Sequence, residues 1–210
     1  MLENVQVLCH SSILINKEKV IYIDPFRIKS TYNDADVVMI THDHFDHYSE
    51  EDIEKVKKED TIIVLPTSLE EKAKNIGFKK QNIILVEPNQ QYNIQQIKIQ
   101  TIPAYNIGKR FHPKENNWIG YILEIEGRRY YIPGDTDITE ENKKVKCDVA
   151  FMPVGGTYTM NSKEAAELVN YIKPKIAIPI HYGEVVGSKQ DAIDFAKRIS
   201  KEIKCEILIK

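Results

Sequence analysis

A cluster of histidines and aspartates near residue 45 is the part of the sequence best suited to chemistry. Residues 41–47, which read THDHFDH, hold three of the chain's six histidines. His42 and His44 are two positions apart, so in an extended loop their side chains point to the same side and can bind one ion together. Asp46 and His47 can turn toward a second ion where the chain enters the next helix. Imidazole nitrogens and carboxylate oxygens suit zinc, manganese, iron or nickel, so the segment predicts a site for divalent ions.

Two residues later in the chain, an aspartate and a histidine, each come after an expected apolar strand. Asp135 follows Gly134 and an apolar strand expected at 128–132, and His181 follows an apolar strand expected at 176–180. Taken alone, Asp135 is typical of a Gly-Asp turn and His181 of a structural histidine. Residues 41–47 also follow an apolar strand. The three features together therefore predict that Asp135 and His181 join the early histidines in one metal site.

The elements that must position these side chains are short strands interspersed with a few helices. Ser49 and Asn161 are helix N-caps by residue type, and Gly77 and Pro174 are helix terminators. Helices are expected after Ser49 and at 68–75, 161–172 and 190–202. Runs rich in apolar and β-branched residues predict strands at 5–8, 13–16, 19–24, 36–41, 62–65, 83–86, 97–102, 118–126, 128–132, 148–152, 176–180 and 206–209.

No linker or low-complexity stretch interrupts the chain, so we expect one domain over residues 1–210. There is also a weak internal similarity. Residues 18–24, followed by the run at 36–39, resemble residues 127–135, followed by the run at 148–151. Both read as turn, strand, aspartate, loop and buried strand. This predicts two similar halves in which Asp24 and Asp135 are counterparts.

Bulk composition excludes several classes of protein. The 210 residues carry a formal net charge of -2, which is unlike the basic surface of a nucleic-acid-binding protein. No apolar run reaches the roughly 18 residues needed to span a bilayer, and the first ten residues do not read as a signal peptide. Cys9, Cys147 and Cys205 form no close pair. We therefore expect a cytoplasmic protein with no nucleic-acid or membrane partner.

Over nearly all its length the chain resembles the metallo-β-lactamase-fold hydrolases. It looks closest to the branch that contains the L-ascorbate-6-phosphate lactonase. This resemblance implies an α/β (α+β) fold, a four-layer αββα sandwich with a metal cleft at one edge. The residues that carry it are His10-Ser11-Ser12, Ile23-Asp24-Pro25, the 41–47 motif, Gly120-Tyr121, and the segments 134–137, 153–160 and 179–183.

The resemblance also implies a division of the ligands between two ions. His42 and His44 would bind the first metal, Asp46, His47 and His181 the second, and Asp135 would bridge them. A cation lowers the pKa of bound water from 15.7 to about 7, so the nucleophile would be metal-activated water. The expected cofactor is one or two divalent ions, zinc or manganese in first place and nickel or iron as alternatives.

One position departs from the family pattern. The family supplies a third histidine to the first metal, and in the corresponding segment 103–106 (PAYN) Asn106 takes its place. Three explanations are open: the first site is weak or empty, His112 replaces the missing ligand six residues later, or His10 approaches from the amino-terminal strand.

Several other residues are candidates for supporting roles. Asp24 could orient a ligand histidine through its ring N–H. The segment Gly155-Gly156-Thr157-Tyr158 could place backbone N–H groups toward a substrate, or could be a turn before a helix. Lys109, Arg110 and Lys114 could bind an anionic substrate, although a solvated loop is the common interpretation of such charges.

These features together predict a metal-dependent hydrolase of a small, anionic ester, lactone or phosphoester, with Asp46 and His181 as catalytic residues. One alternative is a nuclease or phosphodiesterase of the same fold. Another is a non-enzymatic metal- or ligand-binding module whose first site has decayed at Asn106. A homo-oligomer is compatible with the sequence.

Overall fold

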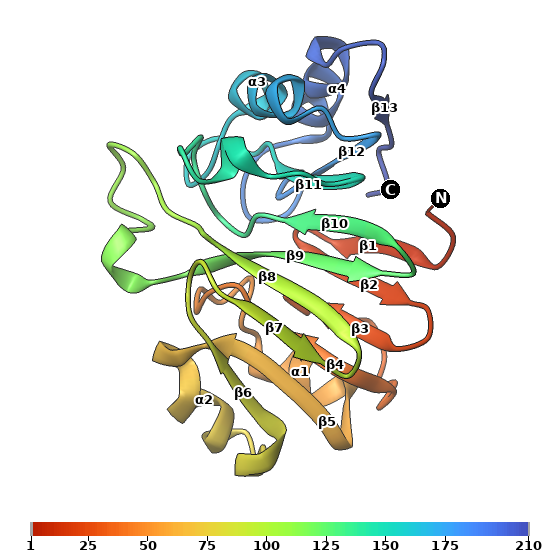
Figure 1. Cartoon of the computed structure of the whole chain (residues 1–210), viewed down its shortest axis with the longest axis vertical. Coiled ribbons are helices and arrows are strands. Elements are labelled where there is room, and N and C mark those ends of the chain that lie inside the picture. The colour runs from red at the N-terminus through yellow and green to blue at the C-terminus, as the bar shows by residue number, and fades with distance from the viewer. Residues whose placement is uncertain (1, 210) are drawn as a thin grey trace. The chain divides into compact units, whose positions relative to one another are not determined.

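The protein is described from a computed structural model that covers residues 2–209. The chain forms two compact units, one of residues 2–86 together with Ile209 and one of residues 87–208. We call them the N-terminal unit (red to yellow in Figure 1) and the C-terminal unit (green to blue), and describe each by itself. The expectation of a single domain over residues 1–210 stays a prediction.

The described residues of the N-terminal unit form a six-stranded sheet in which the strands lie in sequence order. The first three strands are antiparallel and the last three continue in parallel. The strands are β1 (Val5–Cys9), β2 (Ser12–Asn16), β3 (Val20–Ile23), β4 (Ala35–Met39), β5 (Lys57–Pro66) and β6 (Ile83–Val86).

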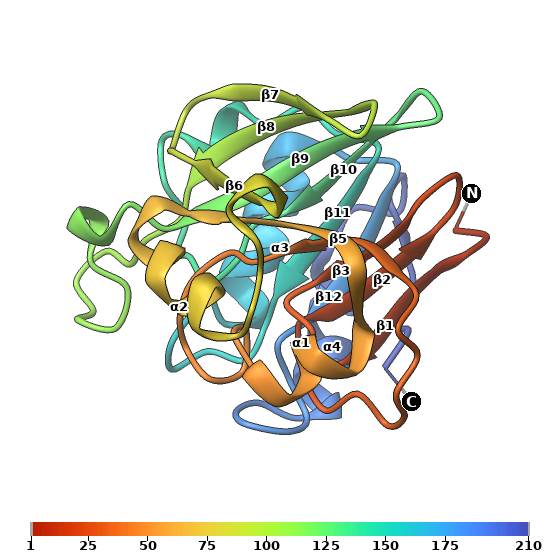
Figure 2. The ribbon, with the colours of Figure 1, turned by 90° about the horizontal axis from the view of Figure 1, so that it is seen from below.

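Two helices cover one face of this sheet, as Figure 2 shows. Helix α1 (Glu50–Val56) begins after Ser49, whose side chain accepts a hydrogen bond from the backbone of Asp52. Helix α2 (Glu70–Asn75) follows a short 3-10 turn. Buried side chains of both helices pack against those of β4 and β5, namely Ile53, Val56 and Ala73 against Val38, Ile63 and Leu65. Burial of this apolar face is the main force that holds such short helices on a sheet.

The C-terminal unit contains a seven-stranded sheet within its described residues, ordered β7 to β13. Strands β7 to β10 pair antiparallel, and β10 to β13 pair in parallel. Helices α3 (Ser162–Ile172) and α4 (Lys189–Arg198) pack against each other and against β11 and β12. The strands are β7 (Gln91–Ile94), β8 (Ile97–Pro103), β9 (Ile119–Ile125), β10 (Arg128–Ile132), β11 (Val149–Pro153), β12 (Ile176–Ile180) and β13 (Lys204–Cys205).

The two units repeat one topology. Strands β1 to β6 pair as antiparallel, antiparallel and then three times parallel, and β8 to β13 follow the same series. Helices α1 and α2 occupy the same places in the first series as α3 and α4 in the second. The weak sequence similarity thus corresponds to a structural repeat. Asp24 directly follows β3. Asp135 lies three residues after the end of β10, which is the counterpart of β3.

The structure confirms the predicted fold class, since residues 2–209 contain two mixed sheets and four α-helices. One predicted element is wrong: residues 206–209 are not a strand, and the last strand is β13. Helix α4 also ends at Arg198 instead of 202. The Asn170 side chain binds the Arg198 carbonyl and the Ser200 N–H, at 3.0 and 2.7 Å, which satisfies the helix end there. Strand β7 was missed because its sequence, QYNI, is mostly polar.

None of the helices within residues 2–209 is both long enough and apolar enough to cross a lipid bilayer.

Candidate metal centre

The N-terminal unit gathers the 41–47 histidines in a tight turn after β4. The backbone N–H groups of His47 and Tyr48 both donate to the carbonyl of His44, at 2.9 and 2.7 Å. This turn brings the His42 ring 4.8 Å from the His44 ring and 4.0 Å from the His47 ring, centroid to centroid. His42, Asp46 and His47 are buried, and His44 is partly exposed. Lys72 of α2 steadies the turn from outside by binding the Asp43 carboxylate at 3.3 Å.

Asp24 fixes the orientation of one of these histidines. Its carboxylate accepts the backbone N–H of Thr41 at 2.8 Å and the Thr41 hydroxyl at 2.7 Å. It also lies 2.7 Å from Nδ1 of His47, so Nε2 of that ring points to the opposite side. Burial raises the pKa of Asp24, while the charge and hydrogen bond of His47 and the donors of Thr41 act in the opposite direction. Sequence reasoning proposed this role for Asp24 but overlooked Thr41, the residue that anchors the carboxylate.

His10 lies in the same unit, in the turn between β1 and β2. Its backbone has a φ of 51°, a left-handed conformation that a non-glycine residue adopts only when the surroundings favour it. The side chain is fully buried, and Nε2 is 3.2 Å from Oδ2 of Asp46. His10 therefore joins the polar cluster of this unit instead of packing in its apolar core.

In the C-terminal unit, Asp135 and His181 come from the ends of two strands that both flank β11. Asp135 follows β10 through Gly134, and His181 directly follows β12, with φ values of 65° at Gly134 and 59° at His181. Parallel strands end at the same edge of a sheet, so the two side chains meet. Nε2 of His181 lies 3.0 Å from Oδ2 of Asp135, and both residues are buried. Gly155 makes this arrangement possible, because a Cβ atom there would overlap the carbonyl oxygen of His181.

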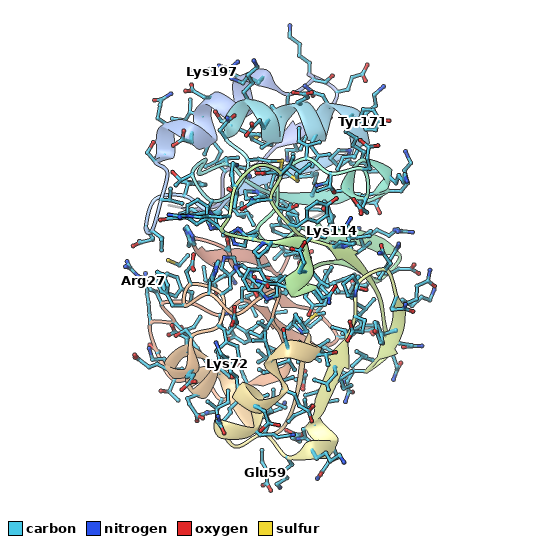
Figure 3. The ribbon with its side chains drawn as sticks, turned by 90° about the vertical axis from the view of Figure 1, so that its left-hand side faces the viewer. Arg27, Glu59, Lys72, Lys114, Tyr171 and Lys197 are labelled. Atoms are coloured by element: carbon cyan, nitrogen blue, oxygen red, sulfur yellow. The ribbon has the colours of Figure 1, made fainter. Side chains whose placement is uncertain are left out.

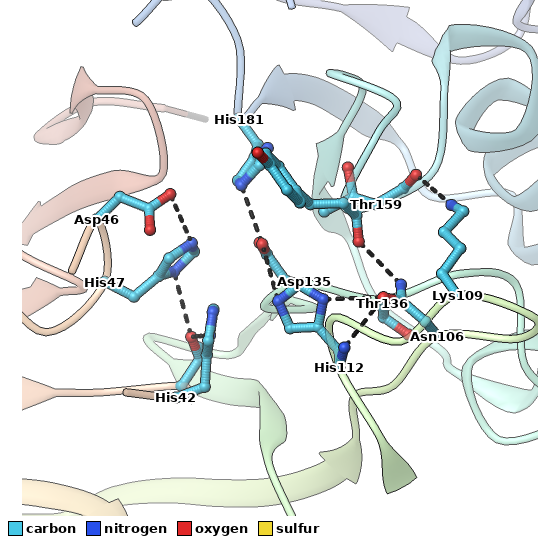
Figure 4. A network of polar contacts seen from close by, with 12 residues as sticks. His42, Asp46, His47, Asn106, Lys109, His112, Asp135, Thr136, Thr159 and His181 are labelled. Carbon is cyan, nitrogen blue, oxygen red and sulfur yellow. Dashed lines mark hydrogen bonds and ion pairs between the residues drawn. The ribbon is translucent and has the colours of Figure 1, made fainter. Parts of the chain in front are cut away.

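His112 completes this cluster, as Figure 4 shows with Asp135 between the two histidines. Nε2 of His112 is 3.3 Å from the same Asp135 oxygen that faces His181, and the His112 side chain is buried. The ring packs edge-on against Trp118, with centroids 5.5 Å apart. The side chain of Asn106 contacts His112 and the backbone of Tyr158.

The remaining candidates, two lysines of the 106–117 loop and Tyr158, make contacts elsewhere in the unit. Lys109 pairs with Asp137 at 2.6 Å, and Lys114, labelled in Figure 3, pairs with Glu141 at 2.9 Å. The carbonyl of Tyr158 accepts the Asn106 amide, and its ring packs edge-on against Phe111. These contacts give the two lysines and Tyr158 a role in holding the loop.

The donor set fits a divalent cation. All six histidines of the chain lie in the two clusters, and five of them are buried. Within the N-terminal unit, one ligand atom each of His42 and His44 lie within 4.8 Å of each other, as do ligand atoms of His10 and Asp46. The same limit holds within the C-terminal unit for Asp135 with His112 and for Asp135 with His181. Ligands at about 2.1 Å from one ion are spaced this closely. Buried carboxylates are stable only when paired or bound to a metal.

Known proteins resemble this chain over most of its length. Residues 4–181 match the family described as the beta-lactamase superfamily domain. A UPF0173 metal-dependent hydrolase of Thermococcus kodakarensis is 30% identical, with 97% of this chain and 95% of the relative covered. A second UPF0173 metal-dependent hydrolase, from Pyrococcus abyssi, is 26% identical, with coverage of 97% and 95%.

A solved structure leads to the same assignment. A candidate metal-dependent hydrolase of Parabacteroides distasonis is 30% identical and superposes with a TM-score of 0.84 over 97% of this chain and 91% of that one. The chain thus belongs to the metallo-β-lactamase superfamily and, within it, to the UPF0173 family of metal-dependent hydrolases. The closer resemblance to the L-ascorbate-6-phosphate lactonase stays a prediction.

Proposed function

We propose that the protein hydrolyses a small ester, lactone or phosphoester with water activated by one or two divalent cations. The observation that carries the proposal is the buried Asp135 carboxylate, one oxygen of which faces the Nε2 atoms of two histidines, at 3.0 and 3.3 Å. The proposed ligands are His42, His44, Asp46, His47, Asp135 and His181, with His112 added as the missing histidine.

Burial explains why these side chains suit a metal better than an ordinary ion pair. Two neutral imidazoles and a carboxylate can all direct lone pairs at one cation, and a low-dielectric setting strengthens each of those bonds. A divalent cation would supply Lewis-acid chemistry, lowering the pKa of water beside it to about 7 and polarising a substrate oxygen. Asp24 holds Nδ1 of His47 at 2.7 Å, which leaves Nε2 of that ring to bind. Asp46 and His181 are proposed to contact the reacting water and substrate.

The choice of metal and compartment belongs to the same proposal. The ligand set contains nitrogen and oxygen donors and no thiolate, which suits zinc or manganese. Cys9, Cys147 and Cys205 are free thiols, in keeping with a reducing cytoplasm. Burial raises the pKa of Cys147 to about 12, so that thiol is a poor nucleophile and a poor ligand. The proposal of an anionic substrate depends on Arg110, since Lys109 and Lys114 are already paired with acidic side chains.

The test combines metal analysis with a substrate screen. The purified protein is analysed for bound metals, stripped with a chelator and reloaded separately with zinc, manganese, iron and nickel. Each form is then assayed on p-nitrophenyl esters, lactones and a phosphodiester. We expect turnover that disappears with the chelator and returns with one of the metals. Absence of hydrolysis across the panel, with metal content confirmed, would refute the proposal.

A pair of variants ties the activity to the site. Asp135→Asn removes the charge that faces the two histidines and should abolish both metal retention and turnover. Asp194→Asn is the matched control, because Asp194 lies partly exposed on α4 of the same unit and accepts a hydrogen bond from Gln190. The control should bind metal and turn over substrate like the wild type.

A further inference from the structure

The side-chain amide of Asn106 is held in a single orientation by two backbone groups. Its Nδ2 donates to the carbonyl of Tyr158 at 2.9 Å, and its Oδ1 accepts the backbone N–H of His112 at 3.2 Å. A backbone carbonyl can only accept a hydrogen bond and a backbone N–H can only donate one. The flipped amide would lose both bonds, so the network determines which way the amide points.

The orientation of this amide in turn determines the tautomer of His112. Nδ1 of His112 lies 3.0 Å from Oδ1 of Asn106, an oxygen that can only accept. Nδ1 therefore carries the proton, and Nε2 presents a lone pair. Nε2 is the atom that lies 3.3 Å from Oδ2 of Asp135. The Nε2 lone pair and the carboxylate oxygen repel each other unless a cation or a proton lies between them.

The loop that carries both residues is closed and pinned at several points. The backbone N–H of Asn106 donates to the carbonyl of His112 at 2.8 Å, which closes residues 106–112 into a ring. Lys109, in the middle of the loop, binds Asp137 at 2.6 Å and the carbonyl of Thr159 at 2.7 Å. The position of His112 is thus set by the hydrogen bonds that hold this loop as well as by its own side-chain contacts.

We propose that Asn106 is a positioning residue that holds His112 in the tautomer and orientation in which Nε2 binds the catalytic cation. This inference rests on the proposed metal-dependent function. It explains why an asparagine can stand where the family has a histidine ligand: both polar atoms of its amide are occupied by His112 and Tyr158. The ligand is displaced six residues along the chain, and the asparagine supports it.

The test uses Asn106→Leu, which removes donor and acceptor together, and Asn93→Leu, an exposed position on β7, as the matched control. Zinc affinity is measured by competition with a chromophoric chelator. Loss of a partner that orients a ligand histidine weakens metal affinity by about 10- to 100-fold. We expect a loss in that range for Asn106→Leu and none for the control. An unchanged affinity would overturn the inference.

A second measurement reads the orientation directly and does not depend on activity. In metal-free protein at mildly alkaline pH, the ring nitrogens of His112 are observed by two-bond ¹H–¹⁵N NMR. The wild type should show the Nδ1–H tautomer, and Asn106→Leu should move toward Nε2–H, the form that imidazole prefers in water. The same His112 tautomer in the wild type and in a well-folded variant would overturn the inference.

Asn106→Asp keeps the inference testable if the leucine variant fails to fold. An aspartate retains the acceptor that faces Nδ1 of His112 and should preserve its tautomer and most of the zinc affinity, although it loses the bond to Tyr158. Failure of the proposed function would appear as absent turnover in the wild type with the His112 tautomer still dependent on residue 106. Failure of the further inference would appear as intact hydrolysis with affinity and tautomer independent of that residue.

Discussion

Replacing Asp24 by asparagine should weaken metal binding, although the substitution leaves the ligand itself unchanged. The effect acts through His47, which contacts Asp24. In the wild type, Asp24 accepts the backbone N–H of Thr41 at 2.8 Å, the Thr41 hydroxyl at 2.7 Å and Nδ1 of His47 at 2.7 Å. The amide oxygen of an asparagine would keep the bond to the backbone N–H, which can only donate. Its NH2 group would then face His47, so Nδ1 of that ring must accept and Nε2 must take the proton.

The magnitude follows from this change of tautomer. A protonated Nε2 has no lone pair for a metal, and restoring it costs the bond between residue 24 and His47. Changes of this kind cost about 10- to 100-fold in metal affinity, which corresponds to about 1.4 to 2.8 kcal/mol at 25 °C. Because the fold around Thr41 keeps its main hydrogen bond, we expect the metal-free protein to unfold at nearly the same denaturant concentration.

The assay is a zinc competition titration of the wild type, Asp24→Asn and Asp34→Asn. The last is a matched control in the same unit, where the partly exposed Asp34 accepts a hydrogen bond from the Tyr22 hydroxyl. Zinc should bind Asp34→Asn as it binds the wild type. A zinc dissociation constant for Asp24→Asn equal to that of the wild type would refute the reasoning.

Three further predictions concern stability. Gly120→Ala should destabilise the protein by about 3 kcal/mol in urea unfolding, because a Cβ there would lie 2.5 Å from the Pro133 carbonyl oxygen and 2.7 Å from that of Ile132, neither of which can move freely. Glu141→Gln should cost about 1 kcal/mol at pH 7. The hydrogen bond from Lys114 lowers the pKa of Glu141 from 4.5 to about 2, so this stabilisation is full above pH 4.5 and is lost as the pH falls toward 2; an equal cost at pH 7 and pH 3 would contradict it. Chelation should lower the melting temperature, since metal at a thousandfold excess over its dissociation constant stabilises the folded state by about 4 kcal/mol; an unchanged melting temperature in a protein shown to bind metal would count against the site.

Much of the fold could be predicted from local patterns. The apolar run before residue 41 is strand β4, the run before His181 is strand β12, and Ser49 caps the first helix. These elements are set by hydrophobic periodicity and by capping chemistry, which are properties of neighbouring residues. The spacing of residues 42–47 likewise indicates a metal site without reference to any distant residue.

The identity of the supporting residues depended on the tertiary structure. Sequence left three explanations for Asn106 open, and it could not show that His112 faces Asp135, which lies 23 residues further along the chain and at 3.3 Å in space. The bend of the 106–112 loop is held by Asp137 and Thr159, and the direction of the Asn106 amide by Tyr158. Local sequence therefore determined which side chains could bind a metal, whereas long-range hydrogen bonds decided which way those side chains point, because such bonds join residues that only folding brings together.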